Sequence, residues 1–419
     1  MRICRVATGA EPVPSTRGAG VESTVHHLSV AQVGLGHDVT VIDVQSEERP
    51  PVPYRVAEVP LRFPADRHNP LIHALRQLRF QRRVLRILKE LLSEERYDVV
   101  HFHSQFAAAA GLGVASRLGA LAVFSSHNPV WASDCLCRSR LRRAKYVMEM
   151  LSLRRADGII TDSGAVAQNL FAYLGVPAEK LRAVPIGVDE AYLAEAPVPH
   201  EFRRRFAPDD APIVLNVARL APYKNQLDLV SAMRHVLDVL PEARLLLVGQ
   251  TEDESYAAKV RRTARDLGVD NRCYLPGVVS AEEMRCLYAV CDVFVLPSLW
   301  ESQGLSVLEA MAVGKPVVAS DIGPVRENVP QDAGVLVPPG DQVAMANAIV
   351  DLLRHPDRAE AMGRRARGFV ESERRWERMA ELTLDAYAQF AGWPARPGGR
   401  GRRPAGQDAL GVRGSRGAQ

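Results

Sequence analysis

The chain has 419 residues, more than one hydrophobic core usually fills, so its length predicts two domains. Apolar residues make up 47% and charged residues 24%, proportions that exclude a fibrous or a largely disordered protein. The nearly neutral balance, a net charge of +4, argues against a dedicated nucleic-acid-binding protein.

In the first half of the chain, short apolar runs alternate with helical stretches. The expected strands are RICRVAT, DVTVIDV, YDVVHFH, LAVFSSH, DGIITDS and LRAVPIG. Helices are expected between them, at roughly 20–34, 70–95, 105–118, 138–155 and 163–174. Buried β-branched runs that alternate with helices predict a parallel sheet covered on both faces.

The second half repeats this plan after a Pro-rich, charged linker, APVPHEFRRRFAPDD. Its expected strands are PIVLNVA, ARLLLVG, RCYLPG, CDVFVLP and KPVVAS. We therefore expect two facing Rossmann-like domains, at 1–195 and 208–375, and a Gly/Pro/Arg-rich disordered tail at 393–419. In such sheets ligands bind outside the carboxyl ends of the strands, so residues that follow strands are the candidates for chemistry.

Two glycines, Gly18 and Gly20, follow the first expected strand and precede a helix. Glycines at this place let backbone N–H groups approach an anion at a helix N-terminus. The full G-x-G-x-x-G pattern is absent, because Ser23 stands three residues after Gly20. A phosphate-binding loop and a plain turn both remain open.

Two cations follow the first strand of the second half, in NVARLAPYKNQLDLV. Arg219 leaves the strand and Lys224 stands at the start of the next helix. Two cations at a strand end, beside a helix N-terminus that also attracts anions, predict a diphosphate clamp.

The stretch WESQGLSVLEAMAVGKPVVAS follows the strand CDVFVLP. Gly304 and Leu305 begin a helix whose free N–H groups suit phosphate oxygens. Glu309, little more than one turn into this helix, is placed to accept both hydroxyls of a ribose, and Glu301 to accept hydroxyls of a sugar. The alternative is that both acids only favour the helix dipole.

Several motifs together resemble one family. The pattern E-x-x-G-L-x-x-x-E-A-M followed by G-K-P-V-V-A-S-D closely resembles the signature of retaining glycosyltransferases of family 4, which have the GT-B fold. VARLAPYKN resembles that family's R-L-x-x-x-K-N segment, and VPIGVDE its hinge, with Ile186 in place of the usual Asn. RRWERMAELTLDAY is similar to its closing segment, in which a Trp precedes a helix (376–392) that crosses back to the first domain. The resemblance covers about residues 1–390.

This resemblance implies a role for each matching residue. Arg219 and Lys224 would neutralise the donor diphosphate, Gly304 and Leu305 would meet its β-phosphate, and Glu309 would hold the ribose. Glu301 would contact the transferred sugar, and His127, at the end of its strand, would lie beside that sugar. The backbone around Gly18 and Gly20 would close over the diphosphate. His26, His27, His101 and His103 match no such position and are not expected in the site.

The expected reaction moves a sugar from a nucleotide diphosphate sugar to an acceptor hydroxyl and retains the anomeric configuration. A UDP-sugar is the expected donor, because uridine donors are the commonest in the family that the chain resembles. No D-x-D cluster for Mg²⁺ is present, so no metal and no cofactor are expected. Alternatives are a nucleotide-sugar epimerase or hydrolase on the same two-domain fold, and a nucleic-acid-binding protein that uses the Arg-rich tail.

The acceptor is left open, as a lipid-linked compound or a small glycoside. Basic amphipathic helices at 70–95 and 138–155 suit contact with an anionic membrane surface, although ordinary surface helices share this pattern. No apolar run is long enough to cross a bilayer, and the cysteines lie mainly in core-like segments. The expected location is the cytoplasm, with peripheral contact at the inner membrane face.

Overall fold

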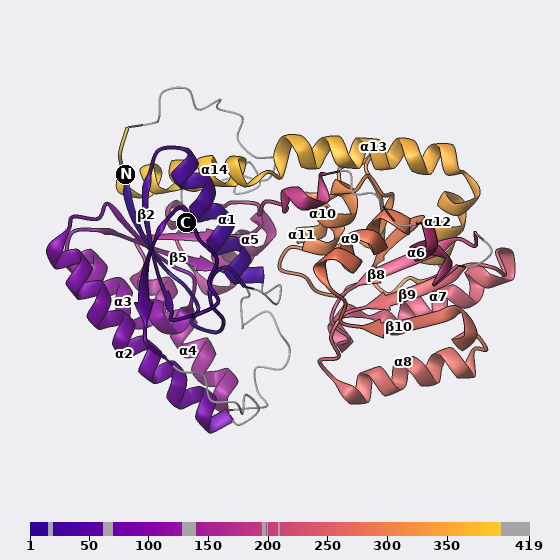
Figure 1. The fold of residues 1–419 in the computed structure, drawn as a ribbon, viewed down its shortest axis with the longest axis horizontal. Coiled ribbons are helices and arrows are strands. Elements are labelled where there is room, and N and C mark those ends of the chain that lie inside the picture. Colours follow the sequence, from indigo (N-terminus) through magenta and orange to yellow (C-terminus); the bar gives the residue numbers. More distant parts are fainter. Residues whose placement is uncertain are drawn as a thin grey trace, which may run out of the picture. The chain divides into compact units, whose positions relative to one another are not determined.

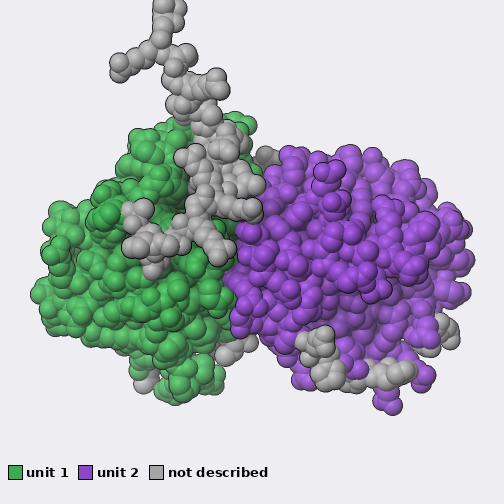
Figure 2. Space-filling model, turned by 90° about the horizontal axis from the view of Figure 1, so that it is seen from above, with its two compact units in different colours: residues 1–187, 376–419 green, residues 188–375 purple. Residues whose placement is uncertain are grey.

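The chain forms two compact units (Figure 2). The computed structural model describes residues 1–15, 20–61, 70–127, 140–194, 198, 200–207 and 210–394. Unit 1 comprises Met1–Gly187 and the segment from Trp376 on, and unit 2 comprises Val188–Arg375. The chain therefore changes unit at 187–188, upstream of the expected linker, and again at 375–376. The expected tail lies, from residue 395 on, outside the described residues.

Unit 1 contains a seven-stranded parallel sheet with the order β3-β2-β1-β4-β5-β6-β7 (Figure 1). Its strands are β1 (Arg2–Val6), β2 (Asp38–Val44), β3 (Arg55–Val59), β4 (Val99–Phe102), β5 (Leu121–Ser126), β6 (Gly158–Thr161) and β7 (Leu181–Ala183). Each central strand is buried on both faces, which explains the continuous apolar runs of the sequence.

Six helices in the described part of unit 1 cover this sheet. They are α1 (Gly20–Gly34), α2 (Pro70–Glu94), α3 (Gln105–Arg117), α4 (Arg140–Arg155), α5 (Gly164–Leu174) and α14 (Trp376–Ala391). Helices α2, α3 and α4 pack side by side, and α1 packs along α14 (Figure 1). Alternate residues of β1 face different layers: Cys4 and Val6 join the apolar core with α2 and α3, whereas Arg5 reaches Gln32 of α1.

The second crossing of the chain ends at Trp376, the first residue of α14. The indole stacks on His27 of α1, with ring centroids 4.9 Å apart. A Cβ atom at Gly187 would lie 2.6 Å from this indole. Any larger residue at position 187 would therefore force the tryptophan to move. Helix α14 then runs along α1 and contacts β5 and β6, the return to the first domain that the sequence motif implied.

Unit 2 contains a six-stranded parallel sheet with the order β10-β9-β8-β11-β12-β13. Its strands are β8 (Ile213–Val217), β9 (Arg244–Val248), β10 (Cys273–Gly277), β11 (Val293–Leu296), β12 (Val317–Ser320) and β13 (Val335–Val337). The helices are α6 (His200–Arg204), α7 (Gln226–Val239), α8 (Glu254–Asp266), α9 (Ala281–Val290), α10 (Leu305–Ala312), α11 (Gly323–Asn328), α12 (Gln342–Arg354) and α13 (Pro356–Glu373). Helices α7, α8 and α12 close an apolar core over the sheet, and α10 packs against α13 and the other strand surface (Figure 1).

Two parallel-sheet, Rossmann-like domains with helices around them constitute the GT-B architecture. The switch in strand order of unit 2 falls between β8 and β11, where one crossover leaves toward β9 and the other toward β12. Loops that follow these two strands meet at one edge of the sheet, which is the place where such folds bind ligands.

Candidate functional site

The loops after β8 and β11 are joined to each other in unit 2. The backbone N–H of Leu299 donates to the carbonyl oxygen of Tyr223 over 2.9 Å. The rings of Tyr223 and Trp300 pack edge to face, with centroids 6.3 Å apart. This connection brings the two sequence motifs, about eighty residues apart in the chain, into one cluster.

Lys224 and Glu301 form the centre of this cluster. Lys224 ends the short helix η4 (Pro222–Lys224), and its Nζ lies 2.6 Å from Oε1 of Glu301. Ser298 Oγ donates to the same carboxylate oxygen over 2.8 Å. The side chains are only 14% and 7% exposed, so the pair is held with little water around it. A cation fixed in this way is already oriented when an anionic ligand arrives.

Arg219 lies at the solvent-exposed rim of the cluster. Its Nη1 is 3.0 Å from Oε2 of Glu252, and the Tyr223 hydroxyl donates to that same oxygen over 3.0 Å. The guanidinium also stands 5.9 Å from the centroid of the Tyr223 ring. Burial is the main cause that raises the pKa of Tyr223 to about 12, so this phenol remains a hydrogen-bond donor at neutral pH.

Gly304 is the N-cap residue of α10 and has the left-handed backbone conformation, with φ 75° and ψ 50°. Glycine has no side chain to cap the helix, so the first N–H groups, beginning at Leu305, point out of the helix end. The preceding loop is held by Asn328, whose Nδ2 donates to the carbonyl oxygen of Gln303 over 2.6 Å. Arg374 in turn donates to Asn328 Oδ1 over 3.3 Å. These hydrogen bonds hold the loop that leads into the N-terminus of α10.

Glu309 lies one turn further along α10 and is half-buried. The hydroxyl of Tyr288, on α9, donates to its Oε2 over 2.7 Å. Burial raises the pKa of Glu309 to about 7, even though this hydrogen bond lowers it. The ring of Tyr288 packs edge to face on Tyr192, which follows the first crossing into unit 2. Glu309 is therefore a carboxylate on the border of ionisation at neutral pH.

His127 ends β5 in unit 1 and belongs to a chain of hydrogen bonds. Its Nδ1 lies 2.9 Å from Oδ1 of Asp162, and its Nε2 lies 2.8 Å from Nδ1 of His103. The Nε2 of His103 lies 3.1 Å from Nη1 of Arg5. An arginine only donates, so His103 must carry its proton on Nδ1 and donate to His127, which then donates from Nδ1 to Asp162. The chain of bonds fixes the tautomers of both histidines.

Arg5 is fully buried and no described carboxylate pairs with it. Its Nη2 donates to Gln32 over 2.6 Å, and its Nη1 lies 3.4 Å from Nδ1 of His101. His101 receives a hydrogen bond from Tyr387 of α14 over 2.7 Å. Burial, reinforced by the nearby Arg5 guanidinium, holds the pKa values of His101 and His103 well below the ordinary histidine value, so both rings are neutral.

The remaining site glycines are described only in part. Gly20 is the exposed first residue of α1, and no atom lies within 4 Å of a Cβ built on it. Gly18 lies outside the described residues. Within the described ranges, no three His, Cys, Asp or Glu side chains come together as metal ligands, and no helix has the length and apolarity needed to cross a membrane.

Sequence reasoning missed His103, Asp162 and Tyr288. The sequence does contain a pattern that could have indicated His103, because several apolar strands carry polar residues at alternate positions. These residues are Arg5 in β1, His101 and His103 at the end of β4, and Ser125 and His127 at the end of β5. Because alternate residues face the same side of a sheet, such a pattern on neighbouring strands indicates one shared polar layer.

Comparison with known proteins agrees with this architecture. The model described as Glycosyltransferase Family 4 matches residues 18–192, and the model Glycosyl transferases group 1 matches residues 198–369. A GDP-mannose-dependent alpha-(1-6)-phosphatidylinositol monomannoside mannosyltransferase of Mycobacterium tuberculosis is 31% identical over 314 residues, covering 71% of this chain and 77% of the relative. A D-inositol 3-phosphate glycosyltransferase of Xylanimonas cellulosilytica is 30% identical, covering 71% and 73%.

Solved structures show the same fold. Sucrose-phosphate synthase from Thermosynechococcus elongatus superposes with a TM-score of 0.73 at 25% identity, covering 94% of this chain and 99% of that one. The catalytic domain of starch synthase IV from Arabidopsis thaliana gives a TM-score of 0.72 at 17% identity, covering 93% and 99%. With the two expected parallel sheets, both halves matched by family models and relatives above 30% identity, the chain belongs to glycosyltransferase family 4 and is a glycosyltransferase with the GT-B fold.

Proposed function

We propose that this enzyme transfers a sugar from a nucleoside diphosphate sugar to an acceptor hydroxyl, with retention of the anomeric configuration and without a metal ion. The observation that carries the proposal is the half-buried Lys224, paired with Glu301 just before the uncapped N-terminus of α10. When the glycosidic bond breaks, the leaving diphosphate gains negative charge. A cation and backbone N–H groups that are already oriented stabilise this charge without reorganisation.

Each predicted site residue then has a role. Lys224 and Arg219 would contact the diphosphate, and the N–H groups at Gly304 and Leu305 its β-phosphate. Glu309 would accept the ribose hydroxyls. The sugar would meet Glu301 and His127, and the loop of Gly18 and Gly20 would cover the diphosphate.

The proposed chemical step takes place on one face of the sugar. The bond between the anomeric carbon and the phosphate oxygen breaks, and a bond from the acceptor oxygen to that carbon forms. The acceptor proton passes to the leaving phosphate oxygen, so no carboxylate pair flanking the bond is needed. Lys224 would stabilise the leaving diphosphate in this step. Its contact with Glu301, which also accepts from Ser298, supports this role because it keeps the ammonium at a fixed position.

The donor base and sugar are the finer part of the proposal. Uridine donors are expected from the family signature, whereas relatives at 29–31% identity are named for GDP-mannose. We give GDP-mannose priority, because these relatives share most of the length of both domains with this chain. Their names also point to an inositol-containing acceptor, either phosphatidylinositol monomannoside or, in further relatives, inositol 3-phosphate.

A lipid acceptor requires contact with a membrane surface. Four exposed basic residues of α2, namely Arg79, Arg82, Arg86 and Lys89, follow one another at helical spacings of three and four. They therefore share one face, which suits anionic lipid at the cytoplasmic side of a membrane. Two further arginines of this helix, Arg76 and Arg83, instead donate to backbone oxygens of unit 1.

The decisive experiment is a donor panel with the purified enzyme. UDP-, GDP- and ADP-sugars are incubated with inositol 3-phosphate, phosphatidylinositol and simple glycosides, with and without EDTA, and the linkage of any product is read by NMR. We expect transfer that survives EDTA and keeps the donor's anomeric configuration. Lys224→Ala should lower kcat/KM by about 10²–10³-fold, while Arg234→Ala, an exposed arginine of α7 paired with Asp238, should leave it unchanged.

Incubation with donor alone separates this function from the alternatives. An epimerase would change the sugar and a hydrolase would release it to water, both without an acceptor. Conversion of donor at the same rate with and without acceptor would refute the transferase proposal.

A further inference from the structure

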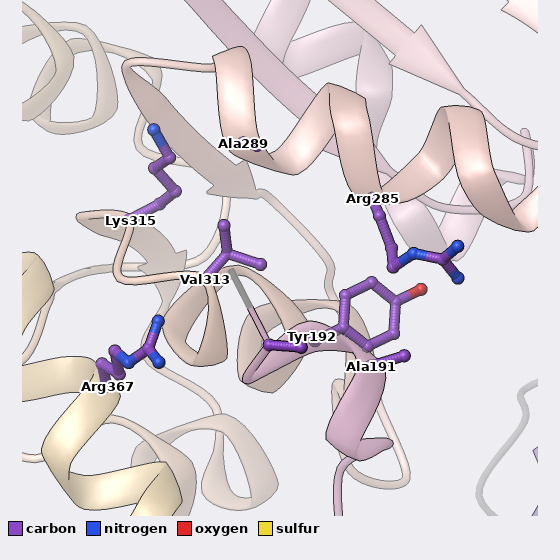
Figure 3. A pocket seen from close by; sticks show the side chains of 8 residues that line it. Ala191, Tyr192, Arg285, Ala289, Val313, Lys315 and Arg367 are labelled. Atoms are coloured by element: carbon purple, nitrogen blue, oxygen red, sulfur yellow. The ribbon is translucent and has the colours of Figure 1, made fainter. Parts of the chain in front are cut away.

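A cavity of about 320 Å³ in unit 2 lies apart from the loops of the donor site. Its walls are the short helix η3 (Glu190–Tyr192), α9, the turn after α10, and α13 (Figure 3). The turn contains Lys315, which precedes β12, so this wall stands at the amino end of the strand. The donor loops follow the carboxyl ends of β8 and β11, at the opposite edge of the same sheet.

Three cations from three different elements line the cavity: Arg285 of α9, Lys315 and Arg367 of α13. No carboxylate is among the lining residues. Figure 3 shows Lys315 and Arg367 on one side of Val313, and Arg285 beside the Tyr192 ring on the other. Like charges that share a concave surface repel one another, and the repulsion is reduced where an anion lies close by, as Glu371 does for Arg367.

The three cations differ in how they are held. Arg367 donates from Nη2 to the carbonyl oxygen of Leu193 over 2.6 Å and pairs from Nε with Glu371 over 2.9 Å, so its guanidinium is fixed in the wall. Lys315 and Arg285 are half-buried, and neither takes part in an ion pair or a side-chain hydrogen bond with any described residue. Two half-buried cations are thus available to a ligand, beside a third that is already oriented.

Most carbonyl groups at the end of α10 are hydrogen-bonded within the following turn. The carbonyl groups of Glu309, Ala310 and Met311 accept from the backbone N–H groups of Val313, Lys315 and Gly314. Three of the last four carbonyl groups of the helix are therefore satisfied by the turn that follows it. Tyr192 adds a phenolic hydroxyl on the other wall, whose pKa is raised by burial, so that it stays protonated and able to donate.

We propose that this cavity binds a small phosphate monoester through Lys315, Arg285 and Arg367. A phosphate monoester is close to a dianion at neutral pH and has several acceptor oxygens, which suits a cavity lined by several cations better than a single carboxylate does. The volume is at the lower end of small-molecule pockets, enough for a phosphate with a short polyol or a single sugar ring. The same headgroup chemistry occurs in soluble metabolites and in phosphatidic acid.

The test is calorimetric titration of the full chain with inorganic phosphate and with glycerol 3-phosphate. The double variant Lys315→Met, Arg285→Met keeps the aliphatic stems and removes both charges. We expect its affinity for glycerol 3-phosphate to fall about tenfold or more, since a hydrogen bond to a charged group is being lost at each position. Lys224→Ala, which weakens the donor loops, should retain this binding, and Arg234→Ala serves as the control for general charge.

A second arm measures binding to phosphatidylcholine vesicles with and without phosphatidic acid. The cavity would be assigned to a lipid headgroup if two results were found together. The parent chain would not respond to glycerol 3-phosphate, and the double variant would lose the binding that depends on phosphatidic acid. Equal affinity of the parent and the double variant for every probe would overturn the proposal, as would binding abolished by Lys224→Ala. Both results are independent of whether the proposed donor is correct.

Discussion

Nδ1 of His103 lies 2.8 Å from Nε2 of His127, and the two imidazole rings stack with centroids 5.2 Å apart. Since Asp162 holds the opposite nitrogen of His127, the ring is fixed from both sides. His103 is neutral, because burial keeps its pKa well below the ordinary value. The orientation of a candidate site residue thus depends on a histidine that has no role in the sequence signature.

Replacement of His103 tests this dependence. His103→Ala removes the hydrogen bond to His127 and should lower kcat about ten- to hundredfold with a smaller change in donor KM. In His103→Asn, the side-chain amide is able to donate to Nε2 of His127, so part of the activity should return. His235→Ala, at an exposed position of α7, is the control. Equal activity of the alanine variant and the parent, at equal melting temperature, would exclude a positioning role.

Glu309 predicts a pH-dependent contribution to stability. Its pKa in the folded chain is about 7, above the ordinary value of 4.5, because burial disfavours the carboxylate. A raised pKa means that the folded state binds the proton more tightly, so this contribution is fully present below pH 4.5 and is lost as the pH rises through about 7. The loss is about 2–3 kcal/mol.

Glu309→Gln removes this titration. The free energy of unfolding of unit 2 in this variant should fall less than that of the parent between pH 4.5 and pH 8, as measured by urea denaturation at several pH values. The variant should also lose affinity for a nucleotide donor. Parallel pH profiles of the two proteins would show that Glu309 does not titrate in this range.

Arg219 is paired with Glu252 over 3.0 Å, and the two side chains are 53% and 41% exposed. An exposed pair of this kind contributes only about 0–1 kcal/mol. A diphosphate must compete with Glu252 for the guanidinium, so Glu252→Gln should lower donor KM about two- to fivefold at low salt. The gain should disappear at high ionic strength and in the Arg219→Ala background. An increased KM would mean that Glu252 orients Arg219 for the donor.

The regular elements could be predicted closely. The expected helices at 20–34, 105–118 and 163–174 agree with α1, α3 and α5 to within one residue, since alternation of apolar strands and helices is strong in a buried parallel sheet. Two strands were not predicted, β3 (Arg55–Val59) and β13 (Val335–Val337). Both are edge strands, short and partly exposed, so they lack a continuous apolar run.

The candidate site could be predicted where it depends on strand ends. Lys224 and Glu301 follow two strands, and carboxyl ends of neighbouring parallel strands meet at one edge. The partners of Glu309 and His127 could not be predicted in the same way. Tyr288 lies on a preceding helix and His103 at the end of another strand, and their contacts depend on helix packing and strand order. The sequence motifs contain neither.

Gly304 provides the last prediction, because its backbone conformation sets the start of α10. At φ 75° an L-residue is strained, and a Cβ at this position would lie 3.3 Å from Cγ2 of Val325 and 3.4 Å from Cδ2 of Leu296. Gly304→Ala should therefore destabilise unit 2 by about 1–2 kcal/mol and reduce transfer, since the N–H groups of the helix end would be displaced.

The matched control for this variant is Gly368→Ala. Gly368 lies inside α13, has no atom within 4 Å of an added Cβ and has no positive φ, so alanine there should raise stability by about 0.5–1 kcal/mol. Thermal unfolding of both variants measures the two effects, and initial transfer rates at saturating acceptor measure the functional part. If Gly304→Ala unfolds earlier but keeps the parent's kcat/KM for the donor, the N-terminus of α10 does not bind the diphosphate. If both variants are as stable as the parent, the left-handed conformation at Gly304 imposes no strain.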